Sequence, residues 1–286
     1  MKDTNASFVP PVIRSRRNPL VRDLLRMGRS GRFAASFPAE GLRLVETLLP
    51  LTEPRLLVLS ETAAKDARWR DPVCGTAVLA DDVFAALSTT ETSQGVLLVL
   101  DRPPEPEATV CGLRAAGLGA PEGLPSPCLL VLEDVQDPGN VGTLIRLAAA
   151  LACTGVLVVG DSADPWSAKV ARASMGALWQ LPVVRLRSRQ RGDIRHGEIW
   201  PLLAELGWTT VAAVPEGGEP LGGEMGFAKD EALALLLGNE ANGLDPGTLD
   251  AARRRITIPM PGGAESLNVA LAGAIIVWEL RCRRGG

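Results

Sequence analysis

From Cys128 onward, continuous apolar runs alternate with segments in which apolar residues recur every three or four positions. Unbroken apolar runs are typical of strands buried on both faces of a parallel sheet, and the longer period is typical of helices. We predict strands at 128–135, 155–160, 181–186, 208–214, 232–238 and 255–260. Helices are expected through residue 153, around 167–179, after the charged stretch 187–198, and after Asn268, where Leu271, Ile275 and Trp278 share one face. This order predicts an α/β fold with a parallel sheet covered by helices on both faces.

The first hundred residues show a second, smaller α/β pattern. From Asn18 onward, Leu20, Leu24 and Met27 form one apolar stripe of a predicted helix. Strand-like runs follow at 55–60 and 95–100. Residues 102–127 are crowded with proline, glycine and alanine, which cannot hold a long helix or a central strand. We therefore predict a domain at 1–105, a linker at 106–127 and a second domain at 128–286.

Positive charge is concentrated near the start of the chain. The whole sequence has a net charge of −3, but its first 35 residues hold eight basic and only two acidic side chains. Charges on a helix face are most often simply solvated. Here the number of arginines and the scarcity of acid favour contacts with the phosphates of a nucleic acid. We predict such contacts for Arg16, Arg17, Arg22 and Arg26.

Several classes of protein are excluded by what the sequence does not contain. It has no apolar stretch of membrane-spanning length and no signal sequence at its start, so we expect a cytoplasmic protein with no membrane partner. The five cysteines are widely scattered, without the close pairs of a metal site or the even count of a disulfide framework. We expect no metal and interpret these cysteines as buried or inert thiols.

Three predicted strands end in polar and glycine-containing loops, and ligands of parallel sheets bind beyond such carboxyl ends. The first loop leads to Asn140, placed to cap the next helix, and to Gly142 and Arg146 on one helical face, where the glycine would leave room for a substrate. The second reads Gly238-Asn239-Glu240. The third leads to Ser266 and Asn268 before the final helix. Each polar residue has a plain structural interpretation as a cap or surface group, and these residues alone leave both interpretations open.

Together the three loops resemble the signature motifs of the SpoU family of RNA 2′-O-ribose methyltransferases, also called the TrmH family. The matching set is Asn140-x-Gly142-x-x-x-Arg146, then Gly238-Asn239-Glu240 with Gly243, then Ile258-Pro259-Met260 through Ser266-Leu267-Asn268-Val269. The segment from Asn18 also resembles the L30e-like substrate-binding domain that is usual in this family. One departure is the basic stretch 187–197, which is longer than the family core needs and has no assigned role.

The resemblance implies a trefoil-knotted, SPOUT-type parallel-sheet domain, a homodimer, and S-adenosylmethionine as the methyl donor. It implies backbone contacts to this donor from Gly238, Ile258 and Leu267. It places five further residues in the catalytic pocket, namely Asn140, Arg146, Glu240, Ser266 and Asn268.

The chemistry requires alignment of a ribose hydroxyl with an activated methyl group, and removal of the hydroxyl proton. Arg146 is the family's candidate for assisting the deprotonation, but an arginine stays protonated in ordinary sites. We therefore expect Arg146 to bind the phosphate or hydroxyl of the reacting nucleotide, with proton removal as the alternative. Glu240 and Asn140 are expected to hold Arg146, and Ser266 and Asn268 to hold the nucleotide and the donor.

Other functions fit the sequence less well. A dinucleotide oxidoreductase or a nucleotide triphosphatase would need a glycine-rich phosphate motif that is not present. A serine hydrolase would need a base, and the sole histidine, His196, has no motif around it. The remaining alternative is a non-catalytic RNA-binding scaffold.

The substrate is the least determined part of the prediction. We favour ribosomal RNA, most of all that of the large subunit, over transfer RNA, because a separate basic domain at the amino-terminal end is typical of that branch of the family. The arginine-rich, lysine-poor composition fits an actinobacterial host. It is also compatible with self-protection against an antibiotic of the thiostrepton or avilamycin kind.

Overall fold

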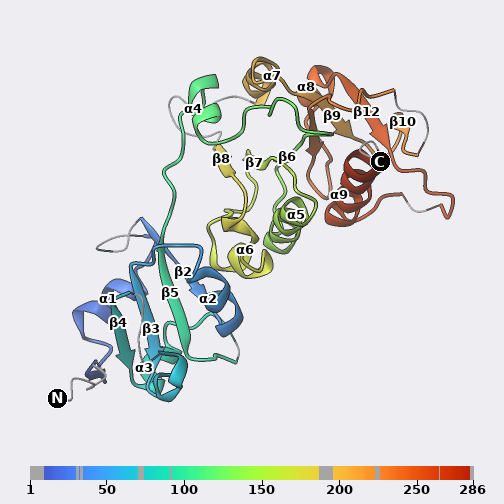
Figure 1. Cartoon of the computed structure of the whole chain (residues 1–286). Coiled ribbons are helices and arrows are strands. Elements are labelled where there is room, and N and C mark those ends of the chain that lie inside the picture. Colours follow the sequence, from blue (N-terminus) through green and yellow to red (C-terminus); the bar gives the residue numbers. More distant parts are fainter. Residues whose placement is uncertain are drawn as a thin grey trace. The chain divides into compact units, whose positions relative to one another are not determined.

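The computed structural model of the protein describes residues 10–29, 32, 35–69, 74–90, 92–186, 196–222, 226–263 and 265–283. The chain forms two compact units (Figure 1). The first comprises Met1–Pro103 with Trp166–Ala168, and the second comprises Pro104–Pro165 with Lys169–Gly286. The basic residues Arg187, Arg189, Arg191 and Arg195 of the predicted stretch 187–197 lie outside the described residues.

The first unit is a mixed five-stranded sheet in the order β1-β4-β3-β5-β2. Its strands are β1 (Val12–Ile13), β2 (Ser36–Glu40), β3 (Leu56–Ser60), β4 (Thr76–Leu79) and β5 (Val96–Asp101). β1, β4 and β3 are parallel, whereas β5 runs antiparallel to both of its neighbours. The helices are α1 (Pro19–Leu25), α2 (Leu42–Leu48) and α3 (Asp81–Ala85). The two strands predicted here, β3 and β5, are confirmed, and the sequence pattern missed β1, β2 and β4.

A buried carboxylate organises one end of this sheet. Glu40 ends β2 with only 6% of its surface exposed. Burial alone would raise the pKa of its carboxyl. Hydrogen bonds from the hydroxyls of Ser88, Thr90 and Ser93 and from the Thr89 N–H outweigh burial and lower the pKa. Glu40 thereby fixes the loop that leads from α3 into β5.

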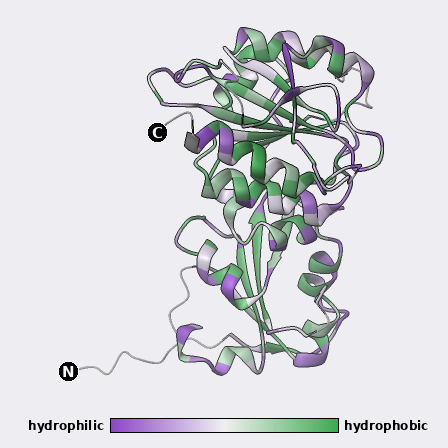
Figure 2. Cartoon of the chain, turned by 90° about the vertical axis from the view of Figure 1, so that its right-hand side faces the viewer, coloured by the Kyte–Doolittle hydropathy of each residue, from purple (hydrophilic) through white to green (hydrophobic). Residues whose placement is uncertain are grey.

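The second unit contains a seven-stranded sheet in the order β10-β12-β9-β11-β6-β7-β8, in which every pairing is parallel. Its strands are β6 (Cys128–Glu133), β7 (Gly155–Val159), β8 (Val183–Leu186), β9 (Thr209–Ala213), β10 (Glu219–Pro220), β11 (Leu233–Leu237) and β12 (Arg254–Thr257). In Figure 2 the strands are predominantly hydrophobic. The predicted parallel α/β architecture is therefore confirmed.

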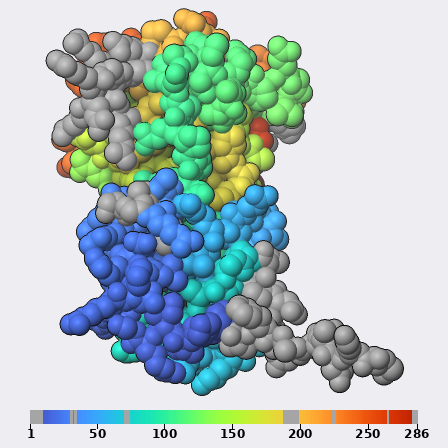
Figure 3. Space-filling view, turned by 90° about the vertical axis from the view of Figure 1, so that its left-hand side faces the viewer, coloured from blue at the N-terminus to red at the C-terminus, as the bar shows by residue number. Residues whose placement is uncertain are grey.

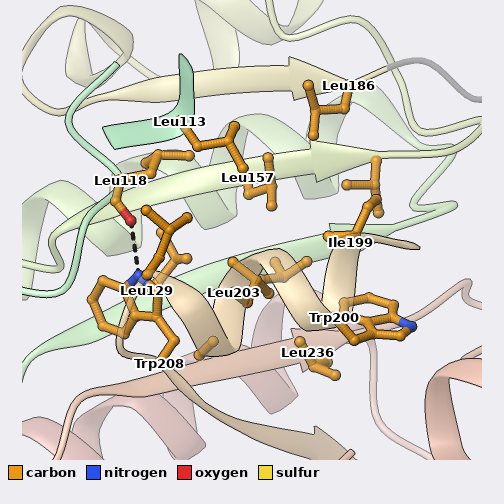
Figure 4. Close-up of a cluster of buried hydrophobic side chains, with 14 of the residues drawn as sticks. Leu113, Leu118, Leu129, Leu157, Leu186, Ile199, Trp200, Leu203, Trp208 and Leu236 are labelled. Carbon is orange, nitrogen blue, oxygen red and sulfur yellow. Dashed lines mark hydrogen bonds between the residues drawn. The ribbon is translucent and has the colours of Figure 1, made fainter. Parts of the chain in front are cut away.

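Helices cover both faces of this sheet (Figure 1). One layer comprises α4 (Val110–Ala115), α7 (His196–Glu205) and α8 (Pro246–Ala251), and the other α5 (Pro138–Ala150), α6 (Ala168–Ala173) and α9 (Val269–Trp278). Figure 4 shows the core between the first layer and the strands, where the indole N–H of Trp208 donates to the carbonyl of Leu118 at 2.8 Å. Leu113 and Leu118 belong to this core, so the segment 106–127, expected as a linker, is partly built into the second unit.

The end of the described chain is fastened to the beginning of the second unit. The guanidinium of Arg281 donates hydrogen bonds to the carbonyls of Leu151 at 3.1 Å and Pro125 at 3.0 Å, and also to that of Ser126. These bonds hold the segment that follows α9 against the loops that precede β6 and β7. In the part of the chain that the structure describes, no helix is both long and apolar enough to cross a membrane.

Candidate functional site

The parallel sheet brings the carboxyl ends of β6 and β11 together, because these strands are neighbours. The loop 134–137 connects β6 to α5, and the loop 238–245 connects β11 to α8. The segment 258–268 leads from β12 into α9. The three predicted strand-end loops therefore supply one site.

Three side chains, two from these loops and one from the first turn of α5, form a continuous hydrogen-bonded series. Nδ2 of Asn268 donates to Oδ1 of Asn140 at 3.0 Å. Nδ2 of Asn140 in turn donates to Oε1 of Glu240 at 2.9 Å. Because each amide donates from its nitrogen and accepts at its oxygen, the carboxylate of Glu240 fixes the orientation of both amides.

The predicted role of Asn140 as a helix cap is wrong. Asp137 is the N-cap of α5, and its Oδ1 accepts the N–H of Asn140 at 2.8 Å. Asn140 lies in the first turn, which leaves its side chain available to Glu240. Asn268 does cap α9, since its Oδ1 accepts the N–H groups of Ala270 and Leu271. The sequence left open whether Asn268 is a helix cap or a residue of the site, and the structure allows it to be both.

A cavity of about 470 Å³ lies beside this series, within the usual range for small-molecule sites. Its wall includes Gly238, Ile258 and Leu267, the three residues expected to contact the donor. Glu240, Ser266 and Asn268 also line it. Apolar side chains of β11 and α9, such as Leu237 and Ile276, cover another part of the wall. One pocket thus gathers six of the residues predicted from the strand ends.

The backbone around Gly238 has no room for a side chain. A Cβ there would lie 2.4 Å from the carbonyl carbon of Gly243. Asn239 and Gly243 exchange two backbone hydrogen bonds of 2.9 Å, which closes the predicted turn. Glycine at position 238 is therefore required by the tight turn itself.

Gly142 and Arg146 do not form the open substrate surface that the sequence predicted. Gly142 is buried, and a Cβ there would lie 2.4 Å from Cβ of Ala173 and 2.9 Å from the carbonyl oxygen of Val170. The glycine serves close packing between α5 and α6. The exposed guanidinium of Arg146 has no hydrogen-bonding or ionic partner among the described residues, so the expected contacts with Asn140 and Glu240 are absent there.

The four arginines expected to contact RNA are exposed in the first unit. Their segment, dark blue in Figure 3, covers much of one face of that unit. A guanidinium nitrogen of Arg16 donates to the carbonyl of Asp82 at 3.0 Å. Among the described residues, Arg17, Arg22 and Arg26 have no carboxylate partner. Other arginines of this unit do, as in the pairs Arg14–Glu61, Arg55–Asp101 and Arg68–Glu46.

The chain is similar to known proteins over most of its length. Residues 127–278 match the profile of the SpoU rRNA methylase family. A relative from Bacillus subtilis (strain 168) is 32% identical over 248 residues, which cover 86% of this chain and 88% of the relative. The chain belongs to the SpoU rRNA methylase family. The resemblance carried by the three strand-end motifs is therefore confirmed.

The Bacillus relative is the 23S rRNA (guanosine(2553)-2′-O)-methyltransferase RlmP. Two solved structures extend the SpoU match to the whole fold. A putative RNA methyltransferase of the TrmH family from Porphyromonas gingivalis is 30% identical with a TM-score of 0.72, covering 93% of this chain and 98% of that one. The AdoMet-bound rRNA methyltransferase from Sinorhizobium meliloti is 26% identical with a TM-score of 0.76, covering 96% of this chain and 98% of that one.

Two polar residues at the SpoU site were given no role by sequence reasoning, although Asn239 belongs to one of the three motifs. Nδ2 of Asn239 donates to the carbonyl of Asp134 at 2.9 Å and so joins the two loops. Glu133 ends β6, and its carboxylate accepts the N–H of Asp245 at 3.0 Å. The signal for Glu133 was present in the sequence as a carboxylate at the end of an otherwise apolar strand.

Proposed function

We propose that this chain transfers a methyl group from S-adenosylmethionine to a ribose 2′-hydroxyl of large-subunit ribosomal RNA. The observation that carries the proposal is the Asn268–Asn140–Glu240 series beside the cavity, built from the three motif loops of a SpoU chain. RlmP, which is similar over most of the chain, supports the choice of ribosomal RNA.

The cavity residues fit a nucleoside-like donor. Gly238, Ile258 and Leu267 would offer backbone groups to S-adenosylmethionine, and the apolar wall from β11 and α9 would exclude water from it. When bound, the sulfonium donor supplies an already activated methyl group. The protein's own contribution is then to hold the ribose hydroxyl in line with this methyl and to accept its proton.

The polar residues at the cavity mouth would hold the nucleotide. Ser266 and Asn268 line the cavity, and Asn268 also donates to Asn140, so we assign both to contacts with the ribose and the donor. None of the guanidinium N–H groups of Arg146 donates to another of the described residues. We assign it to the phosphate or hydroxyl of the reacting nucleotide, with assistance to deprotonation as its second possible role.

We also propose the RNA-binding domain and the knot that the family resemblance implies. The first unit, expected to be L30e-like within residues 1–105, would bind RNA through Arg16, Arg17, Arg22 and Arg26. The guanidinium groups of Arg17, Arg22 and Arg26 pair with no carboxylate among the described residues. They support this assignment because a nucleic acid would have no internal carboxylate to displace. The segment leading into α9 would be threaded as a trefoil knot.

A homodimer completes the proposal. One face of α9 leaves Leu271, Ile275 and Trp278 exposed to 59%, 44% and 57%. Large apolar side chains gathered on one exposed helix face are typical of interaction sites. We propose that a second copy covers this face.

The deciding experiment is to incubate the protein with ribosomal RNA and methyl-labelled donor and to map ribose methylation. Label in a large-subunit nucleotide supports the proposal, whereas label only in transfer RNA selects that alternative substrate. Failure to bind labelled donor would favour the non-catalytic scaffold. A role in antibiotic self-protection stays a prediction, tested by resistance of a host that expresses the protein.

A further inference from the structure

Glu133 is a carboxylate inside the hydrophobic core. The five preceding residues of β6 are apolar and at most 1% exposed, and Glu133 itself is 1% exposed. Burying a carboxylate is costly unless hydrogen bonds replace the water that it loses. An aliphatic side chain would suit this strand better, so the carboxylate is expected to serve a purpose other than packing.

One of the groups that Glu133 binds indicates this purpose. Oε1 of Glu133 accepts the backbone N–H of Asp245 at 3.0 Å. Asp245 directly follows the turn 238–244, which lines the cavity, and begins α8 as its N-cap. Glu133 therefore ties the far end of this turn to the neighbouring strand β6.

Two further ties connect the same pair of loops. Nδ2 of Asn239 donates to the carbonyl of Asp134, whose φ of 54° places it in the left-handed region. The carboxylate of Glu240 accepts Nδ2 of Asn140 at 2.9 Å and faces the N–H groups of Gln136 and Asp137 at 3.4 Å. Of the three ties, only that of Glu133 is made by a fully buried side chain.

The turn between these ties is rigid. Asn239 and Gly243 hold each other by two backbone bonds, and Oδ1 of Asn239 also accepts the N–H groups of Ala241 and Asn242. A rigid turn moves as one body, so a shift at Asp245 is transmitted to Glu240 and to the cavity wall.

We propose that Glu133 is a positioning residue. Through its bond to Asp245 it fixes the position of the turn 238–244, and thereby the positions of Glu240 and of the donor cavity. The inference rests on the proposed methyl transfer for its kinetic consequence. Its structural consequence, the fixing of the turn, can be measured without any RNA.

The test compares Glu133→Gln, which keeps an oxygen acceptor of the same shape, with Glu133→Leu, which removes it. In the Leu variant we expect amide hydrogen exchange in peptides covering 239–245 to rise about tenfold, while thermal unfolding stays close to that of wild type. Its donor affinity, measured by calorimetry, should fall about fivefold, as for one lost hydrogen bond, and kcat should fall at least about tenfold. The Gln variant should recover most of each loss.

Wild-type exchange in 239–245 in a folded Leu variant would overturn the proposal, as would equal losses in the Gln and Leu variants. If the Leu variant does not fold, the tie can be cut from its other end. Asp245→Pro removes the donated N–H and suits the φ of −57° at this position, whereas Asp245→Ala keeps the N–H and loses only the cap. Amide hydrogen exchange in peptides covering 239–245 should be about fivefold faster in the Pro variant than in the Ala variant. The donor Kd of the Pro variant should also be about fivefold higher. Equal behaviour would reject the inference.

If the wild-type protein transfers no methyl group to RNA, the proposed function is refuted. The hydrogen-exchange experiment still tests the positioning role of Glu133 in that case.

Discussion

The side-chain amide of Asn268 donates to Asn140 at 3.0 Å across 128 positions of sequence, while its oxygen caps α9. The two halves of one amide therefore serve different purposes. The nitrogen belongs to the polar series that ends at Glu240, and the oxygen belongs to helix formation. Substitutions can separate them, because aspartate retains the capping oxygen and loses the donor.

We expect Asn268→Asp to keep the stability of the fold and to lose methyl transfer. The carboxylate still caps α9 and interacts favourably with the helix N-terminus, but it faces Oδ1 of Asn140 without a hydrogen to share. Activity should fall at least about tenfold, because the nucleotide-holding groups lose their alignment. Asn268→Ala, the comparison variant, should also lose about 1 kcal/mol of unfolding free energy. Urea unfolding and a methyl-transfer assay measure the two effects, and an Asp variant with full activity would contradict the prediction.

Gly142→Ala should destabilise the protein although it adds a single methyl group. The new Cβ would lie 2.4 Å from Cβ of Ala173 and 2.9 Å from the Val170 carbonyl oxygen, so α5 and α6 must separate. Such overpacking typically costs about 1–3 kcal/mol. Gly262→Ala is a matched control, since a Cβ there meets nothing within 4 Å. Chemical denaturation of both variants checks the expectation, and similar midpoints would show that the helix contact is not tight.

Asn268 and Gly142 also show what the sequence could and could not predict. The apolar runs of the predicted strands correctly placed Asn140, Glu240 and Asn268 near one another. The carboxyl ends of parallel strands lie at the same edge of a sheet, whatever the details of the loops. The neighbours of Gly142 could not be predicted, since α6 lies some thirty positions later and its approach depends on packing. The same holds for Glu133, whose partner Asp245 is 112 positions away. The strands β1 and β4 have only two and four residues, too few for a period to be read, and Pro38 in the middle of β2 counts against a strand.

Arg146→Ala should abolish methyl transfer and leave donor binding nearly intact. Arg146 is exposed on α5 and does not line the cavity, so its loss removes nothing from the donor site. We expect turnover to fall by about a hundredfold or more and the donor Kd to stay within about twofold. Arg114→Ala, at another exposed arginine of the second unit, serves as the control. Calorimetric titration beside an activity assay measures both quantities, and wild-type turnover would remove Arg146 from the mechanism.

Replacing Arg16, Arg17, Arg22 and Arg26 together by Gln should weaken RNA binding and spare donor binding. Each phosphate contact contributes about −0.7 to −0.9 to the slope of log affinity against log salt, because counterions are released. The variant should therefore show a slope shallower by roughly two to four units.

The control for this experiment is Arg14→Gln with Arg68→Gln, since both arginines already pair with carboxylates. It should change the slope less than the fourfold variant does. An unchanged slope in the fourfold variant would mean that this face is only solvated. RNA contacts would then be sought first at Arg187, Arg189, Arg191 and Arg195.

Trp278→Glu should convert the expected homodimer into a monomer. The substitution places a charge within the exposed apolar face of α9, where a second copy would have to desolvate it. Sedimentation at micromolar concentration should give twice the chain mass for the wild type and 30.2 kDa for the variant. A wild-type protein found only as a 30.2 kDa species would count against the dimer.

The fastening of Arg281 also has a consequence for the synthesis of the protein. The cavity wall draws on residues from Ala213 to Ile276, and Arg281 fastens the segment that follows α9 to the loops before β6 and β7. At translation speeds of roughly 5–20 residues per second, the part of the first unit that ends at Pro103 emerges from the ribosome about 10–40 seconds before Arg281. A nascent chain arrested in that interval would carry the arginines proposed to grip RNA and would lack a finished cavity. Such a fragment would compete with the complete protein for the same RNA without modifying it.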